Sequence, residues 1–216
     1  MTYFPPDLVG ILMISLLLLF FAIAIVTSFL CSLWEAVLLS ITPSYAQIQL
    51  QKGSRLGHRL QAFKDDIDRP LAAILTLNTI AHTVGAIGVG DQAARIWADA
   101  NPLITGLAVP AAMTLAILVL SELIPKTLGA NHWQSLAPVT ANCLEFIIRL
   151  LGPLVWLSQL ITRKLKNKDV TSAFSRSDFV AMADIGAQDG VFEEQESEII
   201  TNLLKFRSVQ AKDVMT

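Results

Sequence analysis

Three long runs of the chain are apolar and almost free of charge. A helix that spans a membrane needs about 20 apolar residues, and residues 8–42, 70–97 and 103–125 each meet this requirement. The first run is longer than a bilayer requires, so we expect its helix to tilt or to protrude. Pro70 suits the first turn of a helix, and the turn-forming residues 99–102 separate the second run from the third. The pattern predicts an all-α membrane protein with three transmembrane helices.

The positive charges of the short connections predict how these helices are oriented. Cytoplasmic loops carry an excess of Lys and Arg. The connection between the first and second runs holds five such residues: Lys52, Arg55, Arg59, Lys64 and Arg69. Residues 1–7 and the turn at 98–102 hold none. We therefore expect a multi-pass protein of the cell membrane (plasma or inner membrane) whose N-terminus lies outside and whose C-terminus is cytoplasmic.

A fourth apolar segment, residues 136–162, is interrupted in ways that argue against a simple span. It contains Glu145 and the helix-breaking pair Gly152-Pro153. If it crossed the membrane, the basic residues that follow it would lie outside, contrary to the charge rule. We predict a broken amphipathic helix at the cytoplasmic interface, which forms a juxtamembrane belt over residues 136–168. A fourth crossing is the alternative.

The C-terminal part of the chain changes from apolar to acidic. Residues 175–178 have the sequence of a helix start, and a second amphipathic helix is expected from Glu193 onward. The expected organisation is therefore a transmembrane domain at residues 1–135, the juxtamembrane belt, and a small cytosolic helical bundle at residues 169–216.

Composition narrows the class of protein. Hydrophobic residues make up 53% of the chain and the mean hydropathy is +0.56, which excludes an ordinary soluble domain. Cys31 lies inside the first apolar run and Cys143 is distant in sequence, so we expect two free thiols, and no Cys/His cluster suggests a zinc site. We expect membrane lipid as a partner and no nucleic acid.

Each predicted span carries a polar residue at a comparable depth. Ser32 and Asn78 lie about 12–15 Å from the expected helix ends at Pro43 and Pro70, at a rise of about 1.5 Å per residue. Glu122 reaches the same depth if the third helix continues for a turn beyond its last proline. A charged group within a membrane is costly unless it has a partner or a water-filled path to serve. Hydroxyl, amide and carboxylate oxygens suit magnesium or calcium, so the sequence predicts a divalent-cation site.

These polar residues also have structural explanations. Serine in a membrane helix often bonds its own preceding turn, and asparagine can join two helices. Glu122 could form an ion pair with Lys126, four residues further on. Glu35 and His82 each share a helix face with one of the candidate ligands. Glu35 either lines an ion path, pairs with a basic residue or lines a cavity structurally, and His82 is either a ligand or a contact between helices.

Several short motifs carry a resemblance to a known family. They are Ser-Leu-Trp-Glu-Ala at 32–36, the segment 70–79 that ends in Leu-Asn-Thr, Glu-Leu-Ile-Pro-Lys-Thr at 122–127, Gly-Val-Phe-Glu at 190–193 and the closing Asp-Val-Met-Thr at 213–216. Together they resemble the transmembrane (DUF21) domain and the acidic helical bundle of the CorB/CorC and cyclin M (CNNM) magnesium transporters. The resemblance covers nearly the whole chain.

The resemblance implies a homodimer that exports magnesium by alternating access, with Na⁺ entry as the coupling reaction. It also implies an Mg²⁺ site completed by main-chain carbonyls, with one ligand from each span: Ser32, Asn78 and Glu122. The surrounding residues, which would line the ion path or support the ligands, are Glu35, His82, Lys126 and Ser121.

Two residues and the end of the chain depart from the family pattern. Trp34 stands where many bacterial members have a small polar residue, and His82 stands where an asparagine is common. The chain stops at Thr216, where a paired CBS module should begin, so we expect a truncated chain that lacks the module through which nucleotides would bind. We expect a transporter rather than an enzyme. The alternatives are a membrane-anchored regulatory or scaffold protein, and an intramembrane hydrolase that uses Ser32 with His82.

Overall fold

The computed structural model describes residues 6–97, 103–165, 176–191 and 193–205. Within these ranges every regular element is helical, which confirms the expected all-α class. The chain divides into two compact units, Met1–Leu165 and Lys166–Thr216. The expected cytosolic boundary near residue 169 lies among residues that the structure does not describe.

Three helices of the first unit are long and apolar enough to cross a membrane, as the sequence predicted. The first is α1 (Pro6–Ser40) and the second is α4 (Asp68–Ile96). The third is built from four consecutive pieces: η1 (Ile104–Ala108), α5 (Val109–Ala116), η2 (Ile117–Leu123) and α6 (Ile124–Asn131). The third span therefore continues to Asn131 rather than ending at residue 125.

Two π-helical turns explain why the third span passes through its prolines without ending. Pro110 follows η1 and Pro125 follows η2. A proline cannot donate to the carbonyl four residues before it, and its ring crowds that carbonyl. A π turn moves the bond one residue further back, and the amide of Ile124 accordingly donates to the carbonyl of Val119. The helix is thereby kept continuous across both positions.

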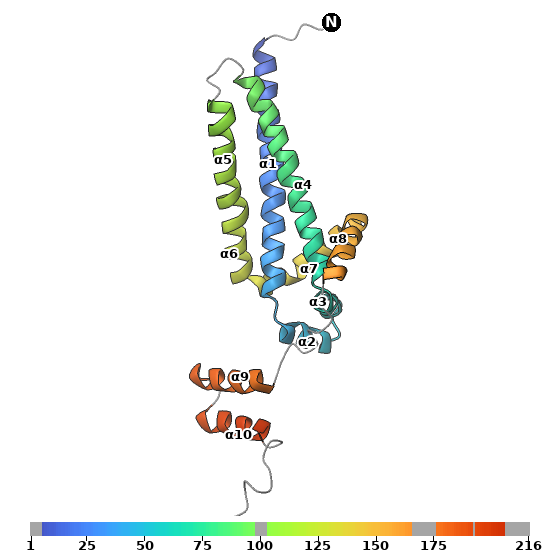
Figure 1. Cartoon of the computed structure of the whole chain (residues 1–216), viewed down its shortest axis with the longest axis vertical. Coiled ribbons are helices and arrows are strands. Elements are labelled where there is room, and N and C mark those ends of the chain that lie inside the picture. The colour runs from blue at the N-terminus through green and yellow to red at the C-terminus, as the bar shows by residue number, and fades with distance from the viewer. Residues whose placement is uncertain (1–5, 98–102, 166–175, 192, 206–216) are drawn as a thin grey trace, which may run out of the picture. The chain divides into compact units, whose positions relative to one another are not determined.

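The central helix of this unit is α1, which packs against α4 on one flank and against η2 and α6 on the other (Figure 1). Small residues permit the close approach. A Cβ added at Gly85 of α4 would overlap the side chain of Ala24, and one added at Gly129 of α6 would lie 2.8 Å from the carbonyl oxygen of Leu33. Contacts as short as these leave no room for a larger side chain.

The basic connection between the first two spans folds into two short helices, α2 (Pro43–Gln51) and α3 (Arg55–Asp65). Each helix begins with a capping hydroxyl, because Thr42 accepts from the amide of Tyr45 and Ser54 accepts from the amide of Gly57. Lys64 donates to the carbonyl oxygen of Leu38 over 3.1 Å, and burial lowers the pKa of this lysine. That bond ties α3 to the last turns of α1.

The segment predicted to form the belt folds into α7 (Trp133–Leu150) and α8 (Gly152–Leu165), which meet at an angle of 87°. The chain bends at the Gly152-Pro153 pair, as the sequence predicted. Each helix alone is shorter than the roughly 20 residues that a span requires, but the bent pair together is long and apolar enough for one broken span. Their position at the membrane surface stays a prediction.

The main hydrophobic core lies where these short helices meet the ends of α1 and α4. It includes Leu38 of α1, Leu60 of α3, Ile74 of α4, Leu144 of α7 and Val155 of α8. We call this end of the bundle the belt end. A smaller cluster of Ala24, Val89 and Met113 holds the spans together further from it.

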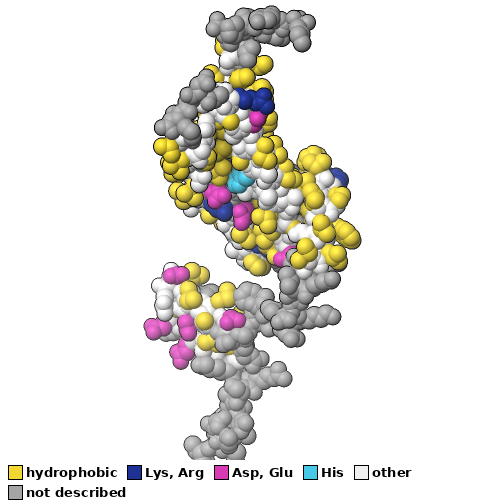
Figure 2. Space-filling model, turned by 45° about the horizontal axis from the view of Figure 1, so that its top comes forward, with side chains coloured by type: hydrophobic (Ala, Val, Ile, Leu, Met, Phe, Trp, Pro, Cys, Tyr) yellow, Lys and Arg dark blue, Asp and Glu magenta, His cyan; other side chains and the backbone are white. Residues whose placement is uncertain are grey.

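The second unit is a pair of helices, α9 (Arg176–Gln188) and α10 (Glu194–Lys205), that pack on each other. Both begin within a residue or two of the positions predicted from the sequence. Gly190 turns the chain with a positive φ of 71°, and Glu196 accepts from the amide of Glu193 at the start of α10. Acidic side chains gather on the face of this unit drawn in Figure 2.

Candidate functional site

The three predicted ligands lie at one depth in the bundle. Ser32 precedes the end of α1 by eight residues, Asn78 follows the start of α4 by ten, and Glu122 precedes the end of α6 by nine. At about 1.5 Å per residue these separations correspond to about 12–15 Å from the belt end. The depth expected for Glu122 required a third helix longer than residues 103–125, and the structure provides it.

The side-chain oxygen of Asn78, Oδ1, is fully buried without a hydrogen-bond donor among the described residues. An unsatisfied buried acceptor costs about 1–3 kcal/mol. Neighbouring hydroxyls do not relieve it, because Thr76 and Thr79 bond the carbonyls of Ala72 and Leu75 in their own helix. A carbonyl oxygen held in this way is suited to a cation.

A cavity of about 300 Å³ reaches Asn78 from the belt end. Its polar lining consists of Glu35, Asp68, Asn78 and Ser158, and no lysine or arginine lines it. Asp68 is the first residue of α4, so the cavity runs along the first turns of that helix. Two carboxylates thus line the cavity beside Asn78, and Glu35 is already paired with Lys126 over 3.4 Å.

The α1 flank contributes two buried serines on one helix face. Ser28 and Ser32 are 0% and 2% exposed, and they lie one turn apart. Ser28 is joined to Nε2 of His82 by a hydrogen bond of 2.7 Å, so His82 acts as a contact between helices. Ser28 is not among the residues predicted from the sequence, although its spacing of four residues from Ser32 is a usable signal.

The third span places Glu122 and Ser121 in the π-helical stretch η2. Ser121 is fully buried and its hydroxyl donates to the carbonyl oxygen of Ile117 over 2.9 Å. Glu122 is half-buried. Irregular turns of this kind are frequent at functional sites, because they redirect side chains that a regular helix would present elsewhere.

Lys126 does not neutralise Glu122 in this structure. Its Nζ lies 3.4 Å from Oε2 of Glu35, so the ion pair connects α6 to α1. Among the ion pairs of the described residues none involves Glu122. The alternative in which Lys126 pairs with the glutamate four residues before it is therefore wrong for this conformation.

The candidate ligands come from three helices, and of the three only Asn78 lines the cavity. In the described ranges no group of three or more His, Cys, Asp or Glu residues is placed to hold a metal ion. Ser32 and Asn78 lie on the packed helices α1 and α4, and Glu122 lies on the other neighbour of α1. No hydrogen bond among the described residues joins the three, so they share a depth and a central helix rather than a preformed network.

Comparison with known proteins places the chain in a family. The family model described as the cyclin M transmembrane N-terminal domain matches residues 18–196. The UPF0053 protein sll1254 of Synechocystis is 30% identical over 195 residues, which cover 90% of this chain and 55% of that protein.

Two further relatives carry more informative names. The UPF0053 inner membrane protein YfjD of Escherichia coli is 28% identical over 53% of this chain and 26% of its own length. A Haemophilus influenzae protein named polyamine export protein is 24% identical over 83% of this chain and 48% of its own length. The chain spans about half the length of curated relatives such as the Synechocystis and Haemophilus influenzae proteins. It is a multi-pass membrane protein of a transporter-type family, and it belongs to the cyclin M (CNNM) family, which includes CorB and CorC.

Proposed function

We propose that this chain is the membrane-spanning part of a magnesium transporter and that Ser32, Asn78 and Glu122 bind the transported ion. The observation that carries the proposal is the buried Oδ1 of Asn78, which lacks a partner among the described residues and lies beside an acidic cavity. A dehydrated Mg²⁺ needs near-octahedral oxygen ligands. A hydroxyl, an amide oxygen, a carboxylate and main-chain carbonyls meet that need.

The cavity at the belt end serves in this proposal as the entrance for the ion. Glu35 and Asp68 attract cations, and Glu35 also holds Lys126 in an ion pair. Sodium is the proposed coupling ion, with Glu35 on its path. The basic residues of the belt end support a cytoplasmic position for it, with the N-terminus outside. Export then moves the ion from this cavity towards the outer half of the bundle, in a homodimer that alternates between two states.

A polyamine is the second candidate cargo. Two relatives, from Haemophilus influenzae and Salmonella typhimurium, are named polyamine export proteins. An acidic cavity of about 300 Å³ would also accept an ammonium group. The three proposed ligands, Ser32, Asn78 and Glu122, favour magnesium over a polyamine. Their oxygens lie at one depth, and this arrangement suits a compact ion better than an extended one.

Transport from reconstituted vesicles tests the proposal. Vesicles containing the protein are loaded with Mg²⁺ or with spermidine, and the efflux of each is followed with and without an inward sodium gradient. We expect sodium-dependent Mg²⁺ efflux that the Asn78→Leu variant lacks. Efflux of spermidine without Mg²⁺ efflux would support the second candidate. Efflux of neither, together with no binding of Mg²⁺, would support a regulatory or scaffold protein.

A further inference from the structure

The first unit has a second cavity at the belt end, and both arginines and acidic residues line it. It measures about 330 Å³, and its charged lining consists of Arg59, Asp66, Arg69, Glu145 and Arg149. A neighbouring hollow of about 240 Å³ shares Asp66 and Arg69 with it and continues along α8 to Trp156. The two form a groove between α3, the start of α4, α7 and α8, which we call the arginine groove.

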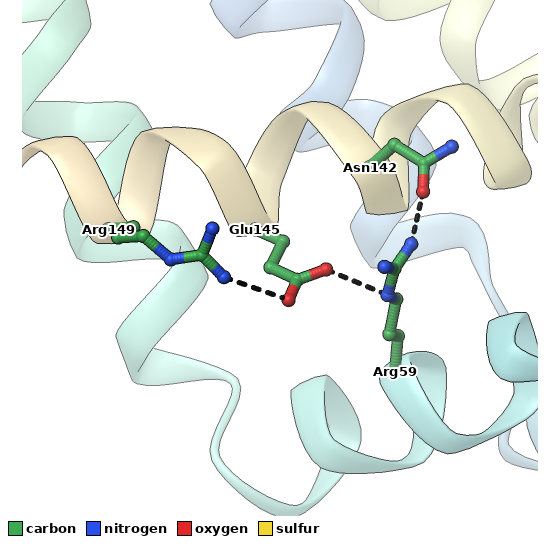
Figure 3. A network of polar contacts seen from close by, with 4 residues as sticks. All are labelled: Arg59, Asn142, Glu145 and Arg149. Carbon is green, nitrogen blue, oxygen red and sulfur yellow. Dashed lines mark hydrogen bonds and ion pairs between the residues drawn. The ribbon is translucent and has the colours of Figure 1, made fainter.

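Both carboxylates of the arginine groove are already bonded within the protein. Glu145 lies between two guanidinium groups, 2.7 Å from Arg59 and 3.3 Å from Arg149 (Figure 3). Arg59 also donates to Oδ1 of Asn142. Asp66 accepts from Nε2 of Gln159 over 3.1 Å. The acidic groups therefore orient the groove and do not leave a second vacant cation site.

One positive charge of the groove remains uncompensated. Three arginines face two carboxylates, and the described ion pairs involve Arg59 and Arg149 but not Arg69. Arg69 is exposed. Arg149 keeps most of its guanidinium accessible, because its side chain is 78% exposed despite its bond to Glu145. The groove thus offers two accessible guanidinium groups and a net charge of one, which fits a singly charged phosphodiester.

The outer surface beside the groove is apolar. Large hydrophobic side chains of α7 and α8 are exposed next to it: Phe146, Leu150, Trp156, Leu157, Leu160 and Ile161. Phe146 and Leu150 flank the groove residues Glu145 and Arg149 in the sequence of α7, and Trp156 lines the groove itself. An amphipathic helix with such a surface lies in the interface of a membrane. The arginines, which can bind a phosphate, therefore lie beside apolar side chains that can contact acyl chains.

We propose that the arginine groove binds an anionic phospholipid, with its phosphodiester at Arg69 and Arg149 and its acyl chains along the exposed apolar residues of α7 and α8. Basic pockets on the cytoplasmic side of membrane proteins bind lipid headgroups in this manner. A free phosphate would use the guanidinium groups but not the apolar surface. The bound lipid would fix the angle between α7 and α8 and hold the belt against the start of α4. The site is separate from the cavity at Asn78 and does not depend on the proposed cargo.

Binding of defined lipids tests this assignment. The purified protein, stripped of lipid in detergent, is titrated with phosphatidylglycerol or phosphatidylcholine, and bound lipid is counted by native mass spectrometry. We expect phosphatidylglycerol to bind in preference, and Arg69→Gln with Arg149→Gln to weaken it about tenfold or more, since each removes a charge-assisted hydrogen bond. Equal binding of the two lipids, or unchanged binding by the double variant, would overturn the proposal.

The chain offers a matched control for the arginine substitutions. Arg95 lies at the other end of α4, is exposed, and pairs with Asp91 four residues before it, as Arg149 pairs with Glu145. Arg95→Gln should leave binding of phosphatidylglycerol unchanged. If the double variant fails to fold, Arg69→Gln alone is measured, because none of the described ion pairs involves Arg69. Displacement of the lipid by millimolar glycerol phosphate would identify a site for soluble anions and would contradict the lipid assignment.

Discussion

Replacing Asn78 by leucine should stabilise the empty protein and abolish its response to magnesium. Oδ1 of Asn78 is buried and accepts no hydrogen bond among the described residues. Leucine has a similar shape and no polar atom, so the substitution removes a penalty of about 1–3 kcal/mol. For a chain of this size that gain corresponds to a rise in Tm of roughly 2–12 °C, at about 2–4 °C per kcal/mol.

Magnesium should stabilise the wild-type protein and leave the Asn78→Leu variant unchanged. A ligand at one hundred times its Kd stabilises the folded state by about 2.7 kcal/mol, so the Tm of the wild-type protein should rise on adding Mg²⁺. The Tm of Asn78→Leu should not change. Thr79→Val is the matched control on the same helix, because the Thr79 hydroxyl bonds only its own helix in this structure, and its magnesium response should persist.

Thermal unfolding in detergent, followed by intrinsic tryptophan fluorescence with and without Mg²⁺, measures both effects. One result would refute the reasoning. If Asn78→Leu lowers the Tm of the empty protein and still responds to Mg²⁺, then the amide joins two helices and is not a ligand. The two roles predict opposite signs for the change in Tm of the empty variant, so one experiment separates a ligand from a structural hydrogen bond.

Three further substitutions probe the packing, the polar contact between helices and the ion entrance. Gly129→Ala should lower stability by about 1–3 kcal/mol through overpacking against α1, whereas Gly90→Ala, which has open space around it, should not lower it; chemical denaturation compares the two. Ser28→Ala should cost about 1–3 kcal/mol by leaving the His82 ring without its partner, and an unchanged denaturation midpoint would show that the bond contributes nothing. Glu35→Gln should slow Mg²⁺ efflux at low internal Mg²⁺ and leave the maximal rate nearly intact, and equal slowing at all concentrations would contradict its role at the entrance.

The spans and the bend between α7 and α8 were predictable because hydropathy and backbone chemistry act locally. The absence of water in a bilayer requires long uncharged helices, and the break at Gly152-Pro153 follows from the backbone chemistry of those residues. The same rules misplaced the end of the third span. They treat Pro125 as a stop, but the π-helical stretch η2 accommodates it and the helix continues to Asn131.

The depth of the three candidate ligands along their helices was predictable from the sequence, but the contacts between helices were not. Residue counting places Ser32, Asn78 and Glu122 at one level, because the rise of a helix is fixed. Which helix faces which partner depends on packing between distant segments, and no local rule supplies it. The ion pair between Lys126 and Glu35 is of this kind. The pairing of Ser28 with His82, 54 residues apart, is another.

Calorimetric titration of Mg²⁺ into the purified wild-type protein and into Glu122→Gln tests the central claim most directly. Glutamine keeps the size of the side chain and removes the charge, and no ion pair of the described residues involves Glu122, so the variant should fold as the wild-type protein does. We predict saturable binding by the wild-type protein and its loss in the variant. Equal binding of Mg²⁺ by both proteins would contradict the assignment of this carboxylate to the ion site.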